Sequence, residues 1–314
     1  MNILITGGCG YTGSVLVENL LKDNHKVIVV DTMWFGNSLK RQNNLKIIKM
    51  DIRNYDKIPL RNISTVVHLA NIANDPSVEL NPNLSWEVNV LATQKLIENC
   101  KKNNVRQFIY ASSGSVYGFK KEKKVTEELS LLPISTYNKT KMIAERVLMS
   151  YSNKINLHII RPATVCGLSP RMRFDVSVNM LTLQALKKKV ITVFGGKQIR
   201  PNIHINDLVR VYIHFIKKPN LPSGFYNAGF ENISIENLAK KIKNQIDCKI
   251  IINKNNNDIR SYRQNSDKLL KTGFKNIYKV SDAISEIKDS FYNNSLKVLP
   301  SSYTVNWMKK KKIN

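Results

Sequence analysis

The chain has 314 residues, of which 42% are hydrophobic and 23% are charged, and its formal net charge is +26. This composition excludes a disordered or collagen-like chain, and no apolar run reaches the ~18 residues that a membrane span needs. We therefore expect a soluble globular protein with no membrane partner. The positive charge keeps a nucleic-acid partner open as an alternative, but the lysines are interspersed with asparagines, which favours a solvated surface without such a partner.

Short β-branched runs alternate with helical patterns through the first half of the chain. Strands are predicted at 3–6, 26–30, 46–49, 65–69, 107–111 and 156–160, and helices at 13–22, 82–102 and 136–150. This alternation implies parallel strands joined by right-handed crossovers, with helices on both faces of the sheet. The predicted fold class is α/β: a doubly wound parallel Rossmann sheet over residues 1–166 and a smaller mixed α/β substrate lobe over residues 167–314. We expect the segment 203–217 to return to the first lobe.

Neither the N-terminus nor the cysteines point to export or to a metal. Met1 leads straight into the first predicted strand without the basic segment of a signal peptide, so we expect a cytoplasmic location. The four cysteines, at positions 9, 100, 166 and 248, have no metal-binding spacing. We expect reduced thiols and no metal.

A glycine-rich turn joins the first strand to the first helix. Gly7, Gly10 and Gly13 are spaced Gly-x-x-Gly-x-x-Gly, with Tyr11 and Thr12 between the last two. Glycine allows the backbone to approach a pyrophosphate, whose charge is met by the free amides of the following helix. The turn predicts a dinucleotide site.

Two acidic positions extend this predicted site. Asp31 ends the second strand, where a carboxylate accepts hydrogen bonds from ribose hydroxyls and repels a 2′-phosphate, so NAD is favoured over NADP. Asp51 and Ile52 follow the third strand, where they are candidates for contact with the adenine edge.

Two Tyr-x-x-x-Lys pairs place a phenol and an ammonium on one face of a helix, where the cation would lower the pKa of the tyrosine. They are Tyr117 with Lys121 and Tyr137 with Lys141. Tyr137 opens an amphipathic helix behind a Ser or Thr cap, whereas Tyr117 precedes a glycine and a lysine-rich loop. We therefore favour Tyr137 as the functional tyrosine.

With these motifs in their order, the chain resembles the extended short-chain dehydrogenase/reductase family, in its nucleotide-sugar epimerase/dehydratase branch, which includes UDP-glucose 4-epimerase-like proteins. The matching segments are TGGCGYTG at 6–13, VVHLAN at 66–71, EVNVLAT at 87–93, SSGSVYG at 112–118, YNKTK at 137–141, RPATVCG at 161–167 and RPNIHINDL at 200–208. The resemblance covers about 300 residues.

The resemblance implies NAD as cofactor and a set of site residues. Tyr137 would be the catalytic base, Lys141 would tune it and hold the nicotinamide ribose, and Ser113 would complete the catalytic group. Leu69 and Ala70 would border the cofactor, with Asn89 near its pyrophosphate or ribose. The substrate-binding residues implied by the resemblance are Ser113, Thr164, Asn179, Val193, Phe194, Arg200 and Arg260. Thr164 departs from the family pattern, which often has asparagine there.

The residues after Ser113 favour epimerisation among the reactions of this branch. Gly114 and Ser115 stand where the 4,6-dehydratases carry an acidic residue, and neither side chain can supply a second acid or base. We therefore predict an NAD-dependent epimerase of a nucleotide-diphosphate sugar, acting at C4 through a 4-keto intermediate. The alternatives are a 4-keto sugar reductase or dehydratase, and a nucleic-acid-binding or regulatory protein on the same fold.

The resemblance also implies a homodimer. The predicted helices 82–102 and 136–150 match those of a four-helix dimer contact in the family, and they carry Trp86, Met142 and Met149 beyond the needs of one buried face.

Overall fold

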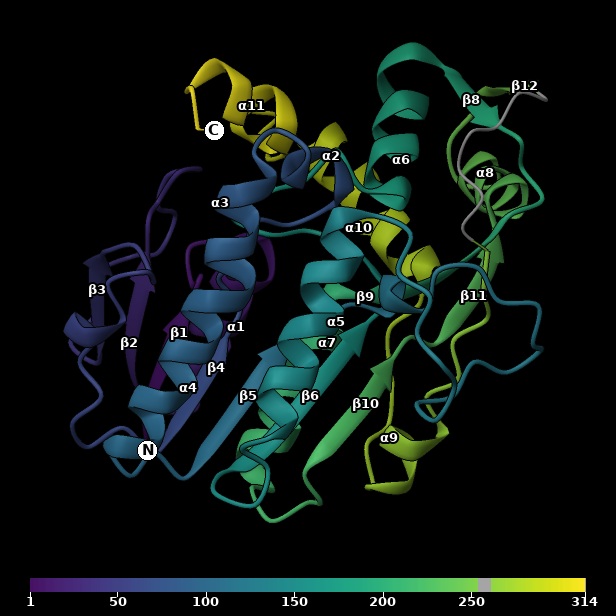
Figure 1. The fold of residues 1–314 in the computed structure, drawn as a ribbon. Helices are drawn as coiled ribbons and strands as arrows, with labels where there is room; N and C mark the ends of the chain where they lie inside the picture. Colours follow the sequence, from purple (N-terminus) through teal and green to yellow (C-terminus); the bar gives the residue numbers. More distant parts are fainter. Residues whose placement is uncertain (254–260, 314) are drawn as a thin grey trace.

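A parallel seven-stranded sheet runs through the centre of the computed structural model, which describes residues 1–253 and 261–313 (Figure 1). The strand order is β10-β6-β5-β4-β1-β2-β3. These strands are β1 (Asn2–Thr6), β2 (Lys26–Asp31), β3 (Leu45–Lys49), β4 (Thr65–His68), β5 (Gln107–Ala111), β6 (Asn156–Pro162) and β10 (Gly224–Ala228). The predicted α/β class with a doubly wound sheet is confirmed.

Helices cover both faces of this sheet because its central strands are apolar on both sides. In β1, Ile3 and Ile5 pack into the core beneath one layer of helices, and Leu4 packs into the core beneath the other. All three side chains are fully buried. The first layer contains α1 (Tyr11–Lys22) and α7 (Ile205–Lys217), and the second contains α4 (Ala92–Lys102) and α5 (Thr136–Met149) (Figure 1).

The helix predicted at 82–102 is divided into three parts. A short α3 (Pro82–Trp86) leads into a π-helical turn, η2 (Glu87–Leu91), and then into α4. Asn89 lies in this turn, and its side chain accepts a hydrogen bond from the Ile72 amide at 2.8 Å and donates to the Ile72 carbonyl at 3.2 Å. The turn therefore ties the helix to the loop that follows β4.

The second half of the chain forms two further small sheets. One pairs β7 (Thr164–Cys166), β9 (Ile199–His204) and β11 (Glu231–Ser234), and the other pairs β8 (Val190–Phe194) with β12 (Lys249–Asn253). The longer helices around them are α6 (Ser177–Lys188), α8 (Ile235–Lys243) and α10 (Val280–Tyr292). The shorter elements are α2 (Asp75–Val78), α9 (Asp267–Lys271), α11 (Thr304–Lys310), η1 (Tyr55–Lys57), η3 (Gly114–Tyr117) and η4 (Pro300–Ser302).

The chain returns to the central sheet after it has built part of the second lobe. Helix α7 packs on α1, and β10 pairs with β6 as the edge strand of the large sheet. The preceding strand, predicted around 203–205, belongs instead to β9 of the three-stranded sheet. The lobes are thus interleaved in sequence beyond the predicted boundary at residue 166. Within the described parts of the chain, no helix has the length and hydropathy to cross a membrane.

Candidate active site

A cavity of about 630 Å³ lies along the carboxyl edge of the central sheet, and we call it the main cavity. The strand order reverses between β1 and β4, and open α/β sheets bind ligands at such a point. Of the residues predicted from the sequence, those that line the main cavity are Gly7, Gly10, Tyr11, Thr12, Gly13, Asp31, Asp51, Ile52, Leu69, Ala70, Ser113, Tyr137, Thr164 and Arg200.

The glycine turn brings bare backbone to the wall of this cavity. Gly7 has φ +75°, and a Cβ there would lie 2.6 Å from the Ala70 amide nitrogen. A Cβ on Gly13 would overlap the carbonyl oxygen of Gly7, so both glycines are required by close packing. Gly10 precedes α1 and provides no side-chain cap, so the first amides of this 12-residue helix remain available for an anion.

Asp31 ends β2 at the same edge of the cavity. Its Oδ2 accepts a hydrogen bond from the Cys9 amide at 2.9 Å, and its Oδ1 accepts one from the Met33 amide at 2.7 Å. Burial raises the pKa of Asp31, while these two hydrogen bonds lower it. The carboxylate is therefore held in place with lone pairs left for ribose hydroxyls. Together with the glycine turn and the apolar Ile52, it fits a dinucleotide with an adenosine ribose at Asp31.

Tyr137 and Ser113 meet at the other end of the main cavity. Ser135 caps α5 by accepting a hydrogen bond from the Asn138 amide at 3.1 Å, which places Tyr137 in the first turn of the helix. Ser113 follows β5, hydrogen-bonds to Tyr137, and has its Oγ 2.7 Å from the Oγ of Ser115. Both hydroxyl-bearing side chains can reach one substrate oxygen from two different elements.

Burial and two nearby charges set the pKa of Tyr137 in the protein without a bound ligand. Burial raises the pKa of Tyr137 and the charge of Asp75 raises it further, whereas the charge of Arg173 and the hydrogen bond to Ser113 lower it. The protein groups alone thus favour the neutral phenol. The charges that act on this pKa are those of Asp75 and Arg173, so the predicted tuning of Tyr137 by Lys141 stays a prediction. A cation bound beside the ring would shift the balance toward the phenolate.

Lys141 lies beneath the cavity and not in its lining. Its Nζ donates to the Ala111 carbonyl at 2.7 Å and lies 5.9 Å from the centre of the Tyr137 ring. Burial lowers the pKa of Lys141 to about 7, although the charge of Glu145 opposes this. A lysine that titrates near neutrality beside a tyrosine can respond to proton transfer at the phenol.

The other Tyr-x-x-x-Lys pair has a different environment. Tyr117 is fully buried outside the main cavity, where its hydroxyl donates to Asn227 Oδ1 at 2.9 Å and accepts from Arg161 Nη1 at 2.7 Å. Lys121 is exposed. Arg161 also forms a buried ion pair with Glu145 at 2.7 Å. This tyrosine is thus part of a structural polar network.

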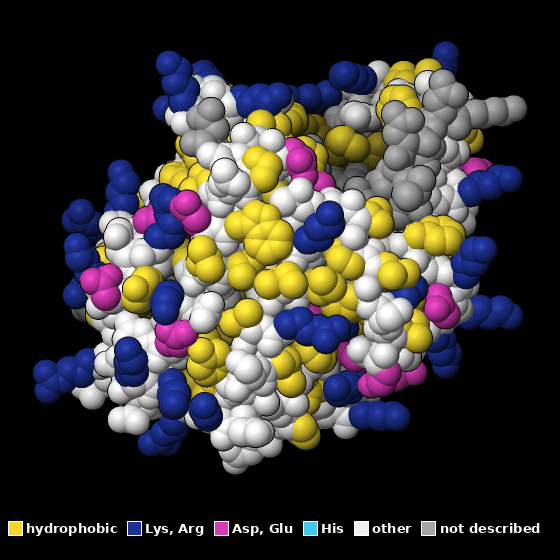
Figure 2. Space-filling view, in the orientation of Figure 1, with side chains coloured by type: hydrophobic (Ala, Val, Ile, Leu, Met, Phe, Trp, Pro, Cys, Tyr) yellow, Lys and Arg dark blue, Asp and Glu magenta, His cyan; other side chains and the backbone are white. Residues whose placement is uncertain are grey.

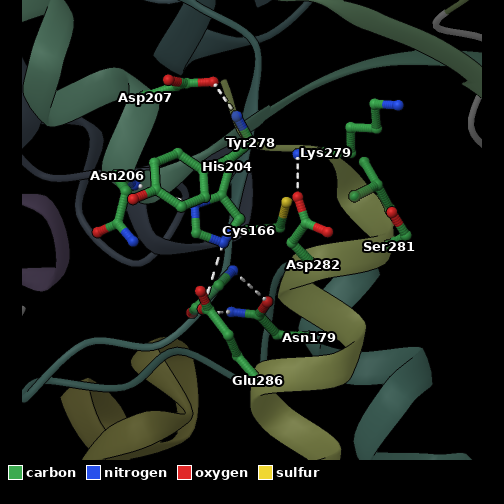
Figure 3. Close-up of polar contacts among 12 residues, drawn as sticks. Cys166, Asn179, His204, Asn206, Asp207, Tyr278, Lys279, Ser281, Asp282 and Glu286 are labelled. Carbon is green, nitrogen blue, oxygen red and sulfur yellow. Dashed lines mark hydrogen bonds and ion pairs between the residues drawn. The ribbon is translucent and has the colours of Figure 1, made fainter. Parts of the chain in front are cut away.

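Several predicted ligand residues lie away from the cavity wall. Asn179, labelled in Figure 3, is fully buried and holds the loop after β7. Its Oδ1 accepts from the Gly167 amide at 3.0 Å, and its Nδ2 donates to the Arg173 carbonyl at 2.9 Å. Asn89 ties the loop after β4 to η2, as described above. Val193 lies in the core and Phe194 is 55% exposed, and neither lines the cavity.

These four residues therefore do not line the main cavity, and their predicted roles toward cofactor or substrate stay predictions. The two asparagines bind backbone groups and the hydroxyls of Thr140 and Tyr11, and the β8 pair faces the core and solvent. Arg260 lies outside the described residues. Among the residues that are described, no group of three or more His, Cys, Asp or Glu side chains could hold a metal ion.

The cavity also contains residues that the sequence analysis did not predict. Asp75 accepts hydrogen bonds from Ser135 and Asn138, and Arg173 forms an ion pair with Asp175 at 2.8 Å. Arg171 and helix α11 contribute a further wall. Arg171 and Arg173 lie in the loop between β7 and α6, where charges are ordinarily solvated, so only the fold reveals that both side chains are largely withdrawn from solvent.

Comparison with known proteins agrees with this geometry. The model of the NAD dependent epimerase/dehydratase family matches residues 3–229. The chain is 35% identical to the "Uncharacterized UDP-glucose epimerase YtcB" of Bacillus subtilis over 245 residues, 73% of this chain and 77% of that protein. It is 28% identical to UDP-glucuronic acid decarboxylase 1 of Xenopus tropicalis over 251 residues, 77% of this chain and 59% of that protein.

A solved structure extends this likeness to three dimensions. UDP-glucuronic acid 4-epimerase from Bacillus cereus, in complex with UDP-glucuronic acid and NAD, is 28% identical with a TM-score of 0.81, and the match covers 94% of this chain and 100% of that one.

Proposed function

Because the chain belongs to the NAD dependent epimerase/dehydratase family, we propose that it epimerises a nucleotide-diphosphate sugar at C4. The observation that carries this proposal is the pairing of Tyr137 with Ser113 in the main cavity, next to two positions, Gly114 and Ser115, that hold no carboxylate. Proton transfer at one hydroxyl needs such a pair, whereas dehydration needs a further acid and base.

In this proposal the protein's residues handle one proton. Ser113 binds the sugar 4-OH and orients it, and Tyr137 takes its proton and returns it to the 4-oxygen at the end of the cycle. NAD, held by the glycine turn and Asp31, would supply the redox chemistry by taking a hydride from C4 and giving it back. The ammonium of Lys141, 5.9 Å from the centre of the Tyr137 ring, stabilises the negative charge that Tyr137 carries as a phenolate. The sugar turns within the cavity between the two halves of the cycle, so that hydrogen returns to the opposite face.

The remaining roles follow from position. Asp31 and the glycine turn would hold the adenosine ribose and pyrophosphate of NAD, with Asp51, Ile52, Leu69 and Ala70 around them. Thr164 and Arg200 would contact the nucleotide sugar, because both line the cavity on the strands of the small sheet. Arginine suits the diphosphate because its fork forms two charge-assisted hydrogen bonds. We propose a uridine nucleotide, since the relatives named above are UDP-sugar enzymes.

The test is product analysis after incubation with UDP-glucose, UDP-N-acetylglucosamine and UDP-glucuronic acid in D₂O. We expect the C4 epimer of one of them, with no deuterium at C5 or C6. A 4-keto-6-deoxy sugar, carbon dioxide, or stoichiometric consumption of NADH would instead assign a dehydratase, a decarboxylase or a reductase.

The dehydratase remains the second candidate because Asp75 lies in the main cavity and acts electrostatically on Tyr137. Asp75 could supply the acid or base group that Gly114 and Ser115 cannot. Cys166 and Glu127, two other side chains with acid–base groups in this part of the fold, do not line the cavity. If dehydration occurs, Asp75→Asn would abolish it; if the protein is an epimerase, the same variant would retain epimerisation.

We further propose that the protein is a cytoplasmic homodimer. Figure 2 shows hydrophobic side chains gathered over α3, α4 and α5, with lysines and arginines mostly toward the rim of this face. Leu91, between α3 and α4, is 56% exposed, and Trp86, Met142 and Met149 are partly exposed. A patch of this kind is typical of an interface. Light scattering at micromolar concentration should give twice the chain mass of 35.9 kDa, and Leu91→Lys should reduce it to one chain.

A further inference from the structure

Arg171 is a buried cation in the main cavity, and no carboxylate of the described residues forms an ion pair with it. Its side chain is only 8% exposed, and its guanidinium stacks 4.1 Å above the ring of Phe35. Its Nη2 donates to the hydroxyl of Thr304 at 3.3 Å, while its Nε is buried without a partner among the described residues. A buried guanidinium with an unused donor is costly unless an anion reaches it.

The contacts of Arg171 place it near the predicted dinucleotide site. Phe35 lies in the loop after β2, and the Arg171 amide donates to Ser169 Oγ at 3.3 Å, which donates to the Tyr11 carbonyl at 2.7 Å. Burial and then the charge of Arg173 lower the pKa of Arg171 to about 9, whereas Asp175, Tyr11 and Asp31 act in the opposite direction. Tyr11 begins α1 and Asp31 ends β2, so both belong to the predicted dinucleotide site. The guanidinium therefore lies beside the loop after β2 and the start of α1, on the side of the cavity predicted to bind adenosine.

The C-terminal segment closes the same side. Val305 and Met308 of α11 line the main cavity, and Met308 is 3% exposed. Trp307 donates from its indole nitrogen to the Trp34 carbonyl at 2.6 Å, which fastens the helix to the loop after β2. In Figure 1, α11 lies above the carboxyl ends of β1 and β2, far in sequence from both. The last helix of the chain thus covers the region where the first two strands receive a dinucleotide.

We propose that Arg171 and α11 form a clamp on NAD, in which the guanidinium binds a pyrophosphate oxygen and the helix covers the adenosine. Phe35 and Thr304 hold the plane of the guanidinium, so little side-chain entropy is lost when its unused donors form charge-assisted hydrogen bonds. The chain must release the Trp307–Trp34 contact before the adenosine can leave. Cofactor release would therefore be slow relative to turnover, as an epimerase that regenerates its NAD allows.

The proposal concerns the cofactor and does not depend on which sugar is turned over. The experiment measures binding of NAD, ADP-ribose and UDP by calorimetry, and the rate of NAD release by dilution, for protein stripped of nucleotide. Arg171→Gln should weaken the binding of NAD and ADP-ribose by about 10–100-fold, the typical effect of losing hydrogen bonds to a charged group. It should leave the affinity for UDP unchanged. Arg171→Lys should recover part of the loss, because it keeps the charge without the fork.

Trp307→Phe tests the helix separately. It should keep the fold, since the ring stays apolar, and accelerate NAD release several-fold through loss of the bond to Trp34. Lys309→Gln, on the exposed side of the same helix, is the matched control and should change neither quantity. NAD binding within two-fold of the unaltered protein in Arg171→Gln would overturn the clamp. Loss of UDP binding in that variant would assign Arg171 to the sugar nucleotide instead and also overturn it.

Discussion

The two Tyr-x-x-x-Lys pairs have the same spacing but entirely different surroundings. Tyr137 lies in the first turn of α5, lines the main cavity and contacts Ser113. Tyr117 ends η3 and is buried among polar side chains. Its hydroxyl donates a hydrogen bond to Asn227 and accepts one from Arg161. A phenol can do proton chemistry only where substrate can reach it, so identical spacing becomes either a candidate active site or a structural network.

The lysines of the two pairs differ in the same way. Lys141 is buried, with a pKa lowered to about 7, whereas Lys121 is exposed. Glu145, one turn beyond Lys141, joins the two regions by binding both Ser112 and Arg161. The buried network thus supports the helix that carries Tyr137.

The largest expected effect is on turnover. Tyr137→Phe should lower kcat by about 10²–10⁴-fold, because it removes the group that moves the proton, while the melting temperature and NAD binding stay close to those of the unaltered protein. Tyr117→Phe is the matched control: it should keep most of the turnover and lose about 1–3 kcal/mol of stability, because Arg161 and Asn227 lose a buried partner. A reversal of the two kcat values would exchange their roles.

The next effect is on stability. Glu145→Gln should destabilise the protein by about 3–5 kcal/mol, because it leaves the buried Arg161 guanidinium without its counter-ion. Glu98→Gln removes a carboxylate from a pair with Lys95 of similar length, 3.1 Å, but at the surface, and should cost less than about 1 kcal/mol. Urea unfolding of both variants measures the contrast. Equal losses would mean that burial does not distinguish the two pairs.

A smaller effect concerns the two lysines. Lys141→Met should raise the melting temperature of nucleotide-free protein, because folding of the variant no longer buries an ammonium group. The same variant should lower turnover. Because the folded-state pKa of Lys141 is lowered to about 7, its cost is greatest below that pH and declines as the pH rises toward the ordinary lysine value. The gain should therefore be largest at pH 6 and shrink by pH 9. Lys121→Met should show no such pH-dependent gain.

The smallest effect is a shift in a pH profile. Asp75 raises the pKa of Tyr137, so Asp75→Asn should lower that pKa and move the acidic limb of the kcat/KM profile to lower pH. The amide oxygen of the introduced asparagine can still accept the hydrogen bond from Ser135, which limits the change in structure. Asp56→Asn, at an exposed site, serves as control. A profile that moves to higher pH, or does not move, would show that the Asp75 charge does not reach the phenol.

Local pattern was sufficient for the cofactor half of the molecule. The glycine turn, Asp31 and the strand–helix alternation are short-range features whose physical demands, a tight turn and a helix start, are met within a few residues. For this reason the strands form where the sequence predicts them, and the candidate cofactor residues from Gly7 to Ala70 line the main cavity. The π-helical turn at 87–91 escaped prediction because the side chain of Asn89 bonds to a loop far from it in sequence.

The second lobe depends on contacts that no local pattern contains. Asn179 and Val193 match family positions by sequence, yet one holds a loop and the other fills the core, because the small sheets and α6 determine which side chains face inward. The meeting of Arg171 with α11 brings together residues more than 100 positions apart.

The sequence by itself therefore determined the fold class and the cofactor, and its helix-cap signal favoured Tyr137 over Tyr117. The tertiary structure decided which side chains are buried, because burial depends on which distant segments pack together. With burial it decided the direction of each pKa shift and the different surroundings of the two tyrosines.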